Sequence, residues 1–131
     1  MLTYEARSDA APDDVWRLMA QPALWPRWAP HIRGAWGLGS PEVQVGRRGL
    51  VRLLGAPLVP ARITRKRSGS VWAWKVGPVE LIHRIDPAAT GGGCRVATDI
   101  DAPAPLEATL RVTYGPLVQL LMNRLARVAC L

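Results

Sequence analysis

Very short connections between apolar segments constrain this chain more than any other feature. A short link around Ser68-Gly69 separates one strand-like run from the next, and Gly77-Pro78 alone separates the following two. Gly55-Ala56-Pro57 is a third short link. Such links reverse the chain direction, because a parallel crossover needs about a dozen residues or more. The chain from residue 31 to residue 101 is therefore predicted to be an antiparallel meander.

Turn residues divide this region into six strand-like segments, and a seventh precedes it at Leu2–Ser8. Each segment is rich in β-branched, aromatic or alternating apolar residues and is bounded by Gly, Pro, Ser or Asp. We predict the six strands at Ile32–Trp36, Arg48–Leu54, Val59–Arg67, Val71–Val76, Val79–Asp86 and Cys94–Asp101.

Two short helices are expected between the first strand and the meander. Pro12 stands in the first turn of one helix, and the acids Asp13 and Asp14 complement the positive end of the helix dipole. A second short helix is expected around Pro22–Trp28, and Pro30 closes it.

The segment Pro103–Leu131 returns to helical spacing, and Gly115-Pro116 predicts a kink or a brief break within it. An apolar stripe of this kind must be buried, and the concave face of the sheet is the one surface large enough. We therefore predict one α+β domain, residues 1–131, in which a curved antiparallel sheet wraps around a long C-terminal helix. The stripe consists of Leu106, Leu110, Tyr114, Leu117, Leu121, Leu125 and Val128.

Side chains alternate along a strand, so each predicted strand has one apolar face and one charged face. Trp72 and Trp74 share an inner face with few polar groups, chiefly His83 and Thr98, whereas Lys66 is assigned to the outer face. An apolar interior with sparse polar anchors is typical of a small-molecule site. The alternative is that the tryptophans fill a solid core. The side chains expected to line the ligand cavity are Trp28, Trp36, Val51, Leu53, Ile63, Trp72, Trp74, Leu81, His83, Val96, Thr98, Tyr114, Leu117 and Leu121.

The net charge of +7 comes almost entirely from arginine, and only Arg62–Arg67 is a dense basic run. The other arginines are scattered, so we do not expect nucleic-acid binding. No apolar run reaches the roughly 18 residues that span a bilayer, and no signal peptide is evident, so we expect a cytoplasmic protein without a transmembrane segment. No coiled-coil seam appears, which leaves a monomer or a weak homodimer.

No cofactor or metal is expected. Cys94 and Cys130 lie far apart in the sequence without the spacing of metal ligands, and His31 and His83 are isolated from them and from each other. A structural zinc site needs about four ligands. We therefore expect two free thiols, and we expect His31 to be a surface or capping residue.

The order and spacing of several motifs resemble the START-like (SRPBCC) superfamily, in particular its polyketide cyclase/dehydrase and lipid-transport group. The matching motifs are the helix start Ser8–Trp16, the WPxW-type segment Leu24–Pro30, Trp72-Ala73-Trp74, the hairpin with His83-Arg84, and Gly91–Val96. The resemblance covers essentially the whole chain. It implies a helix-grip fold of about seven strands around the last helix, with a cavity for lipids, sterols or polyketides.

Three functions remain open at this point. The first is binding of an apolar small molecule, with the Trp25–Trp28 helix and the loop from Gly37 to Gly46 as the entrance. The second is a cyclase or dehydrase that uses His83 as acid or base, with Tyr114 as a hydrogen-bond donor. The third is an interaction module that binds an anionic surface through Arg62–Arg67.

Overall fold

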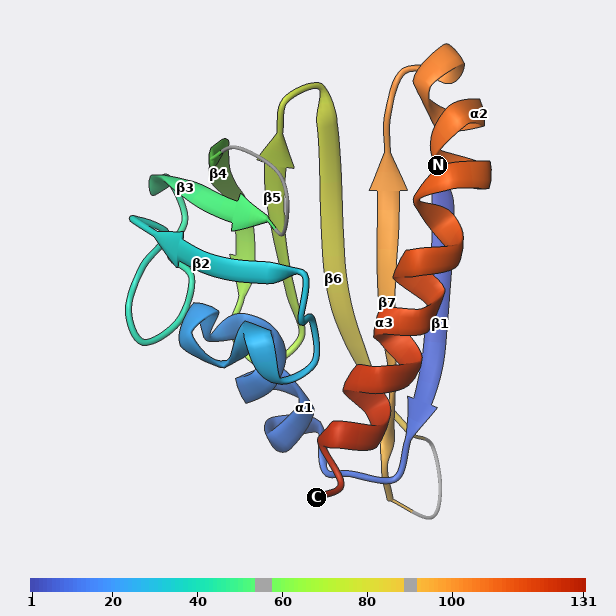
Figure 1. Ribbon diagram of the computed structural model, residues 1–131. Helices are drawn as coiled ribbons and strands as arrows, with labels where there is room; N and C mark the ends of the chain where they lie inside the picture. The colour runs from blue at the N-terminus through green and yellow to red at the C-terminus, as the bar shows by residue number, and fades with distance from the viewer. Residues whose placement is uncertain (54–57, 89–91) are drawn as a thin grey trace.

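A seven-stranded antiparallel sheet forms the framework of the computed structural model, which describes residues 1–53, 58–88 and 92–131. The strand order is β1-β7-β6-β5-β4-β3-β2, so the first strand returns to pair with the last one. Figure 1 shows β2 and β3 curling over the concave side of the sheet. The predicted meander is confirmed, with strands β1 Leu2–Ser8, β2 Ile32–Trp36, β3 Arg48–Leu53, β4 Leu58–Arg67, β5 Val71–Val76, β6 Val79–Pro87 and β7 Cys94–Asp101.

The predicted strand bounds agree closely with the observed ones. β1, β2, β5 and β7 begin and end as predicted, while β4 starts one residue earlier, at Leu58, and β6 ends one residue later, at Pro87. The predicted end of β3 at Leu54 lies outside the described residues.

Two short helices follow β1, as predicted. α1 spans Pro12–Ala20, and the 3₁₀ helix η1 spans Pro22–Arg27. The Trp25 Nε1–H donates to the Met19 carbonyl at 2.9 Å, and the Trp28 Nε1–H donates to the Leu18 carbonyl at 2.8 Å. These bonds fasten η1 against the end of α1, so the two helices form one unit.

The C-terminal segment forms two helices, α2 (Ala104–Thr113) and α3 (Gly115–Val128), which meet at Tyr114. α3 lies on the concave side next to β1 and β7 (Figure 1), whereas α2 has no buried residue. The break predicted at Gly115-Pro116 is therefore confirmed, and the stripe residues Leu110, Tyr114, Leu117, Leu121, Leu125 and Val128 lie in or against the core as expected. The buried side of α3 consists of Gly115, Val118, Leu121, Met122, Leu125 and Ala126.

A register shift in β2 places Trp36 on the opposite face from the one predicted. The shift lies between Ile32 and Gly34, and Trp36 then stands opposite Leu50 with 52% of its surface exposed. Because a one-residue shift exchanges the two faces of a strand, every side chain after it changes side. The expectation that Trp36 lines the interior is wrong.

A second register shift, in β4 between Ile63 and Arg65, corrects the placement of Lys66. Lys66 stands opposite the inward-facing Trp72, and its Nζ lies 3.0 Å from the Glu42 Oε1. The other carboxylate oxygen of Glu42 accepts a hydrogen bond from Trp16 Nε1–H at 3.0 Å. One carboxylate thus joins α1 to the end of β4.

Replacing Gly49 by alanine is expected to destabilise the fold. A Cβ on Gly49 would overlap the backbone carbonyl of Trp36 on the neighbouring strand. Relieving such an overlap shifts the backbone, which lowers the free energy of unfolding by about 1–3 kcal/mol. Urea titration measures the change, and Val112→Ala at a 73% exposed helix position serves as the neutral reference. Equal stability of the two variants would contradict this account.

Candidate functional site

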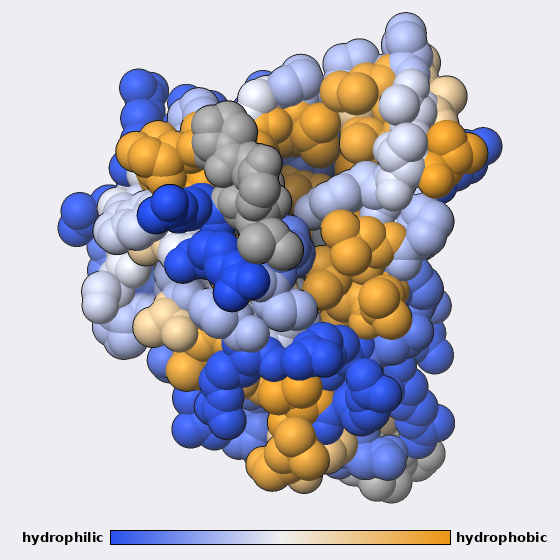
Figure 2. Space-filling view, viewed as in Figure 1, coloured by the Kyte–Doolittle hydropathy of each residue, from blue (hydrophilic) through white to orange (hydrophobic). Residues whose placement is uncertain are grey.

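A small apolar cavity lies between the middle strands of the sheet, η1 and α3. Its volume is about 40 Å³. On the face seen in Figure 2, hydrophobic residues gather along α2 and α3, beside a hollow between these helices and the curled edge of the sheet. The cavity is lined by Trp25, Trp28, Ala29, His31, Ile32, Trp72, Trp74, Leu81, His83, Thr98, Tyr114, Val118, Leu121 and Met122.

Four aromatic rings fill most of the space between the sheet and η1. Trp25 stacks on Trp72, with ring centroids 5.6 Å apart and an angle of 9° between the ring planes. The centroids of the Trp25 and Trp74 rings are 5.2 Å apart. The His83 ring lies 4.5 Å from the Trp72 ring. The remaining 40 Å³ has room for a few waters, whereas pockets for small molecules have roughly 300 Å³ or more. A ligand-sized space is therefore not open in this structure.

Three nitrogens in this cluster have no hydrogen-bond partner among the described residues. They are Nε1 of Trp72, Nε1 of Trp74 and Nε2 of His83, and each residue is more than nine-tenths buried. A buried polar group without a partner costs about 1–3 kcal/mol. By contrast, the indole N–H groups of Trp25 and Trp28 both donate to backbone carbonyls. The three unpartnered nitrogens of the ring cluster all lie on β5 and β6, on the inner side of the sheet.

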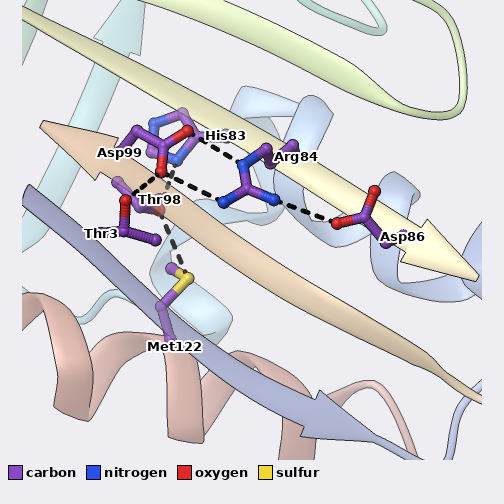
Figure 3. A network of polar contacts seen from close by, with 7 residues as sticks. All are labelled: Thr3, His83, Arg84, Asp86, Thr98, Asp99 and Met122. Atoms are coloured by element: carbon purple, nitrogen blue, oxygen red, sulfur yellow. Dashed lines mark hydrogen bonds and ion pairs between the residues drawn. The ribbon is translucent and has the colours of Figure 1, made fainter. Parts of the chain in front are cut away.

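His83 is held on one side by Thr98, as Figure 3 shows. The His83 Nδ1 lies 2.9 Å from the Thr98 Oγ1, and that oxygen lies 3.3 Å from the Met122 Sδ on α3. When the Thr98 hydroxyl donates to the sulfur, His83 Nδ1–H must donate to Thr98, which leaves Nε2 as an acceptor. Burial lowers the pKa of His83 to about 4, although the negative charge of Asp99 opposes this shift. The ring is therefore neutral at neutral pH.

An ion-pair network occupies the opposite, convex side of the same strands. Arg84 donates to both carboxylate oxygens of Asp99, at 2.9 and 3.3 Å, and Thr3 donates to Asp99 at 2.7 Å (Figure 3). Burial opposes ionisation of Asp99, but the hydrogen bonds from Arg84 and Thr3 outweigh it and lower the pKa of Asp99. These groups face away from the cavity. We therefore assign them a structural role, in which they join β1, β6 and β7.

Comparison with known proteins agrees with this architecture. The sequence model of the family described as "Polyketide cyclase / dehydrase and lipid transport" matches residues 2–129. The chain belongs to this family. The START-like resemblance is thereby confirmed. No curated protein sequence matches the chain.

Solved structures similar to this family member share its helix-grip fold at low sequence identity, which confirms the predicted fold class. XoxI from Bacillus cereus has a TM-score of 0.75 and 14% identity, covering 98% of this chain and 94% of its own. MLL2253 from Mesorhizobium loti has a TM-score of 0.70 and 14% identity, covering 97% and 94%. Ara h 8.0201 has a TM-score of 0.65 and 15% identity, covering 98% and 96%. At these identities the likeness concerns the fold alone.

The structure brings eight of the residues expected from the sequence to the cavity wall: Trp28, Trp72, Trp74, Leu81, His83, Thr98, Tyr114 and Leu121. Val51, Ile63 and Val96 are buried in the core but lie outside this lining, and Leu117 is half-buried outside it. Trp36 is exposed, and the side chain of Leu53 lies outside the described part of the chain.

Six lining residues were not among those expected: Trp25, Ala29, His31, Ile32, Val118 and Met122. His31, expected to be a surface or capping residue, is half-buried at the cavity wall, where its Nδ1 has no partner among the described residues and burial lowers the pKa of the ring. Val118 and Met122 are one helical turn apart on α3 and lie beside the predicted Leu121 and Leu125, so the buried side of α3 is broader than the predicted stripe.

Three further observations concern metal ligands, membrane-spanning helices and cysteines. Within residues 1–53, 58–88 and 92–131, no group of three or more potential metal ligands occurs. No described helix is long and apolar enough to cross a membrane. Cys94 is buried, Cys130 is exposed, and both are free thiols.

Acid is expected to destabilise the protein through His83. Its pKa is about 4 in the fold and 6.5 in an unstructured peptide, so the unfolded chain binds more protons between these values. The His83 contribution to the free energy of unfolding is therefore fully present above pH 6.5. It is lost as the pH falls toward 4, and the total loss is about 3 kcal/mol. Urea titrations across this range measure the slope. His31 and Asp99 add losses of the same sign, so the comparison with His83→Gln isolates the His83 contribution. An identical slope in that variant would refute the assignment.

Proposed function

We propose that the protein binds a small, neutral, largely apolar molecule that carries a hydrogen-bonding oxygen. The observation that carries this proposal is the group of unpartnered nitrogens in the cavity wall, above all the deeply buried Trp72 Nε1, Trp74 Nε1 and His83 Nε2. Two of them are indole N–H donors, and a carbonyl or hydroxyl oxygen accepts from such donors. Membership of a family described by polyketide chemistry and lipid transport supports the proposal.

The charge of the lining favours a neutral molecule over an anion. None of the described lining residues is Arg, Lys, Asp or Glu, and His83 is neutral because its pKa is about 4. An ionised carboxylate in such a site would lack a counter-ion, and a buried unpaired charge is strongly unfavourable. A neutral ketone, ester or phenol therefore fits the wall better than a fatty-acid anion.

Binding requires the Trp25 ring to leave its place on Trp72. Trp25 belongs to η1, a six-residue 3₁₀ helix that contains Pro22 and Pro26 and packs as a cover over the cavity. A flat ligand ring that replaced Trp25 on Trp72 would preserve the stacking contact while reaching the unpartnered indole N–H groups. The function thus rests on an open form in which α1 and η1 have shifted away from the sheet.

Three matched bicyclic probes test the proposal: 1-indanone, indane and indane-1-carboxylate. We expect 1-indanone to bind most tightly, because it alone combines neutrality with a carbonyl acceptor. The measurement is the indole N–H spectrum by NMR, in which the Trp72 and Trp74 signals should move downfield with the ketone. The signal of Trp36, which is 52% exposed and lies outside the cavity lining, is the internal control. Failure of all three probes to perturb the cavity signals would favour a solid core and reject the proposal.

The substitution Trp74→Phe separates the hydrogen bond from the ring contact. It removes the indole N–H and keeps an aromatic side chain, so we expect about fivefold weaker binding of 1-indanone, equivalent to one hydrogen bond of about 1 kcal/mol. Indane binding should be almost unchanged, and calorimetric titration measures both affinities. A parallel loss for the two probes would show that Trp74 acts through packing alone.

Catalysis by His83 is the weaker alternative. The unpartnered Nε2 lies where a substrate could reach it, but a general acid or base works best with a pKa near the operating pH. The His83 pKa of about 4 makes the ring a weak base at neutral pH. Binding is therefore the function that we propose, with His83 as a hydrogen-bonding group.

A further inference from the structure

The convex face of the sheet is divided sharply by charge. The strands β2 to β5 contain no acidic residue, whereas β6, β7 and β1 carry Glu80, Asp86, Asp99, Asp101 and Glu5. Several cations of the first group stand on the convex side, in no ion pair within the described ranges: Arg48, Arg52, Arg62, Arg65, Arg67 and Lys75.

Three of these cations lie side by side across neighbouring strands. Arg48 is directly opposite Arg62, and Arg62 is directly opposite Lys75. Like charges that face each other across a sheet destabilise it. The fold therefore keeps an unfavourable row of charge that an anionic partner would relieve.

Of the three cations in this row, Lys75 is the one that stands opposite an acidic residue of the sheet. Glu80 stands opposite Lys75, and its Oε2 accepts a hydrogen bond from Thr64 at 2.8 Å. The Arg48–Arg62 pair has Lys75, not an acid, as its next neighbour across the sheet. Repulsion between these two arginines is thus left without an adjacent counter-ion.

The other opposed arginine pair on this face is neutralised locally. Arg7 stands opposite Arg95 on β1 and β7, and the Glu5 carboxylate lies 3.9 Å from Arg95. This pair carries the same charge as Arg48 and Arg62 but lies in the half of the face that contains acids. It therefore provides a matched control for the cationic row.

A row of apolar side chains runs beside the cationic row. Trp36 is opposite Leu50, and Leu50 is opposite Pro60, so the three lie across β2, β3 and β4. Trp36 is 52% exposed and Leu50 is 40% exposed. On the next row, Arg52 stands opposite Leu58, which is 49% exposed. Exposed aliphatic and aromatic groups here alternate with arginine.

We propose that this surface, the Arg–Trp face formed by Trp36, Arg48, Leu50, Arg52, Leu58, Pro60 and Arg62, binds the surface of an anionic lipid bilayer. Arginine near a bilayer is attracted by anionic headgroups, and tryptophan favours the headgroup region. Leucine and proline gain free energy by leaving water for acyl chains. A nucleic acid would satisfy the arginines but would leave the row of Leu50 and Pro60 without an apolar partner. The face lies on the opposite side of the sheet from the cavity, so this inference does not rest on the proposed ligand.

Vesicle co-sedimentation with two matched double variants tests the inference. The unaltered protein should bind vesicles that contain phosphatidylglycerol, should not bind phosphatidylcholine alone, and should dissociate as salt is added. Arg48→Gln with Arg62→Gln should lower the partition coefficient about 30-fold, since each cation near the surface contributes about 1 kcal/mol. Arg7→Gln with Arg95→Gln removes the same charge from the other half of the face and should leave binding nearly unchanged. Equal losses in the two double variants would overturn the proposal, because binding would then follow net charge alone.

Trp36 provides a second readout that net charge does not affect. It is the exposed one of the six tryptophans, while the other five are at most 8% exposed. Lipids with brominated acyl chains should therefore quench the Trp36 emission on binding, and Trp36→Phe should abolish that quenching. Absence of quenching in the bound protein would overturn insertion of the apolar row. Complete displacement from the vesicles by transfer RNA, with tighter binding to the RNA, would identify the face as a nucleic-acid site instead.

Discussion

The stack of Trp25 on Trp72 joins the helical unit of α1 and η1 to the centre of the sheet, and the closed form of the cavity depends on this contact. Trp72 belongs to the centre of the sheet, whereas Trp25 belongs to η1, which is fastened to α1 by two indole hydrogen bonds. α1 is fastened in turn to β4, because Glu42 accepts from Trp16 and pairs with Lys66. The position of η1 over the sheet, and with it the closure of the cavity, is therefore set by contacts of indole rings.

These contacts pack the interior well but leave several buried nitrogens without a hydrogen-bond partner. The rings exclude all but a small space, yet Trp72, Trp74 and His83 each retain a buried nitrogen without a partner. A core selected for stability alone would replace such groups with phenylalanine or leucine, which bury apolar surface without an unpaired donor. Retention of unpartnered polar atoms in the wall of a cavity is typical of a site that is completed by another molecule.

The fold is largely predictable from the sequence, and the site only partly so. Short links at Ser68-Gly69 and Gly77-Pro78 leave few alternatives to an antiparallel meander, and regular alternation then places Trp72, Trp74 and His83 on the inner side. Alternation fails where the register of a strand shifts, and for this reason it assigns Trp36 to the wrong side. The volume left between the rings depends on side-chain rotamers and on the position of η1, and neither is encoded in the spacing of apolar residues.

The irregularity in β4 has a consequence for how this strand can evolve. In an uninterrupted strand, Arg65 and Arg67 would share the inner side with Ile63, and two guanidinium groups would enter the core. The extra residue at Thr64 turns both arginines to the convex side and sends Lys66 inward to Glu42 instead. Loss of Thr64 would therefore give a regular strand that keeps Arg65 and Arg67 on the convex side, because alternation would then run directly from Ile63 to Arg65. A related chain that keeps Thr64 in regular alternation would instead need apolar residues in place of Arg65 and Arg67, because both positions would then face the core.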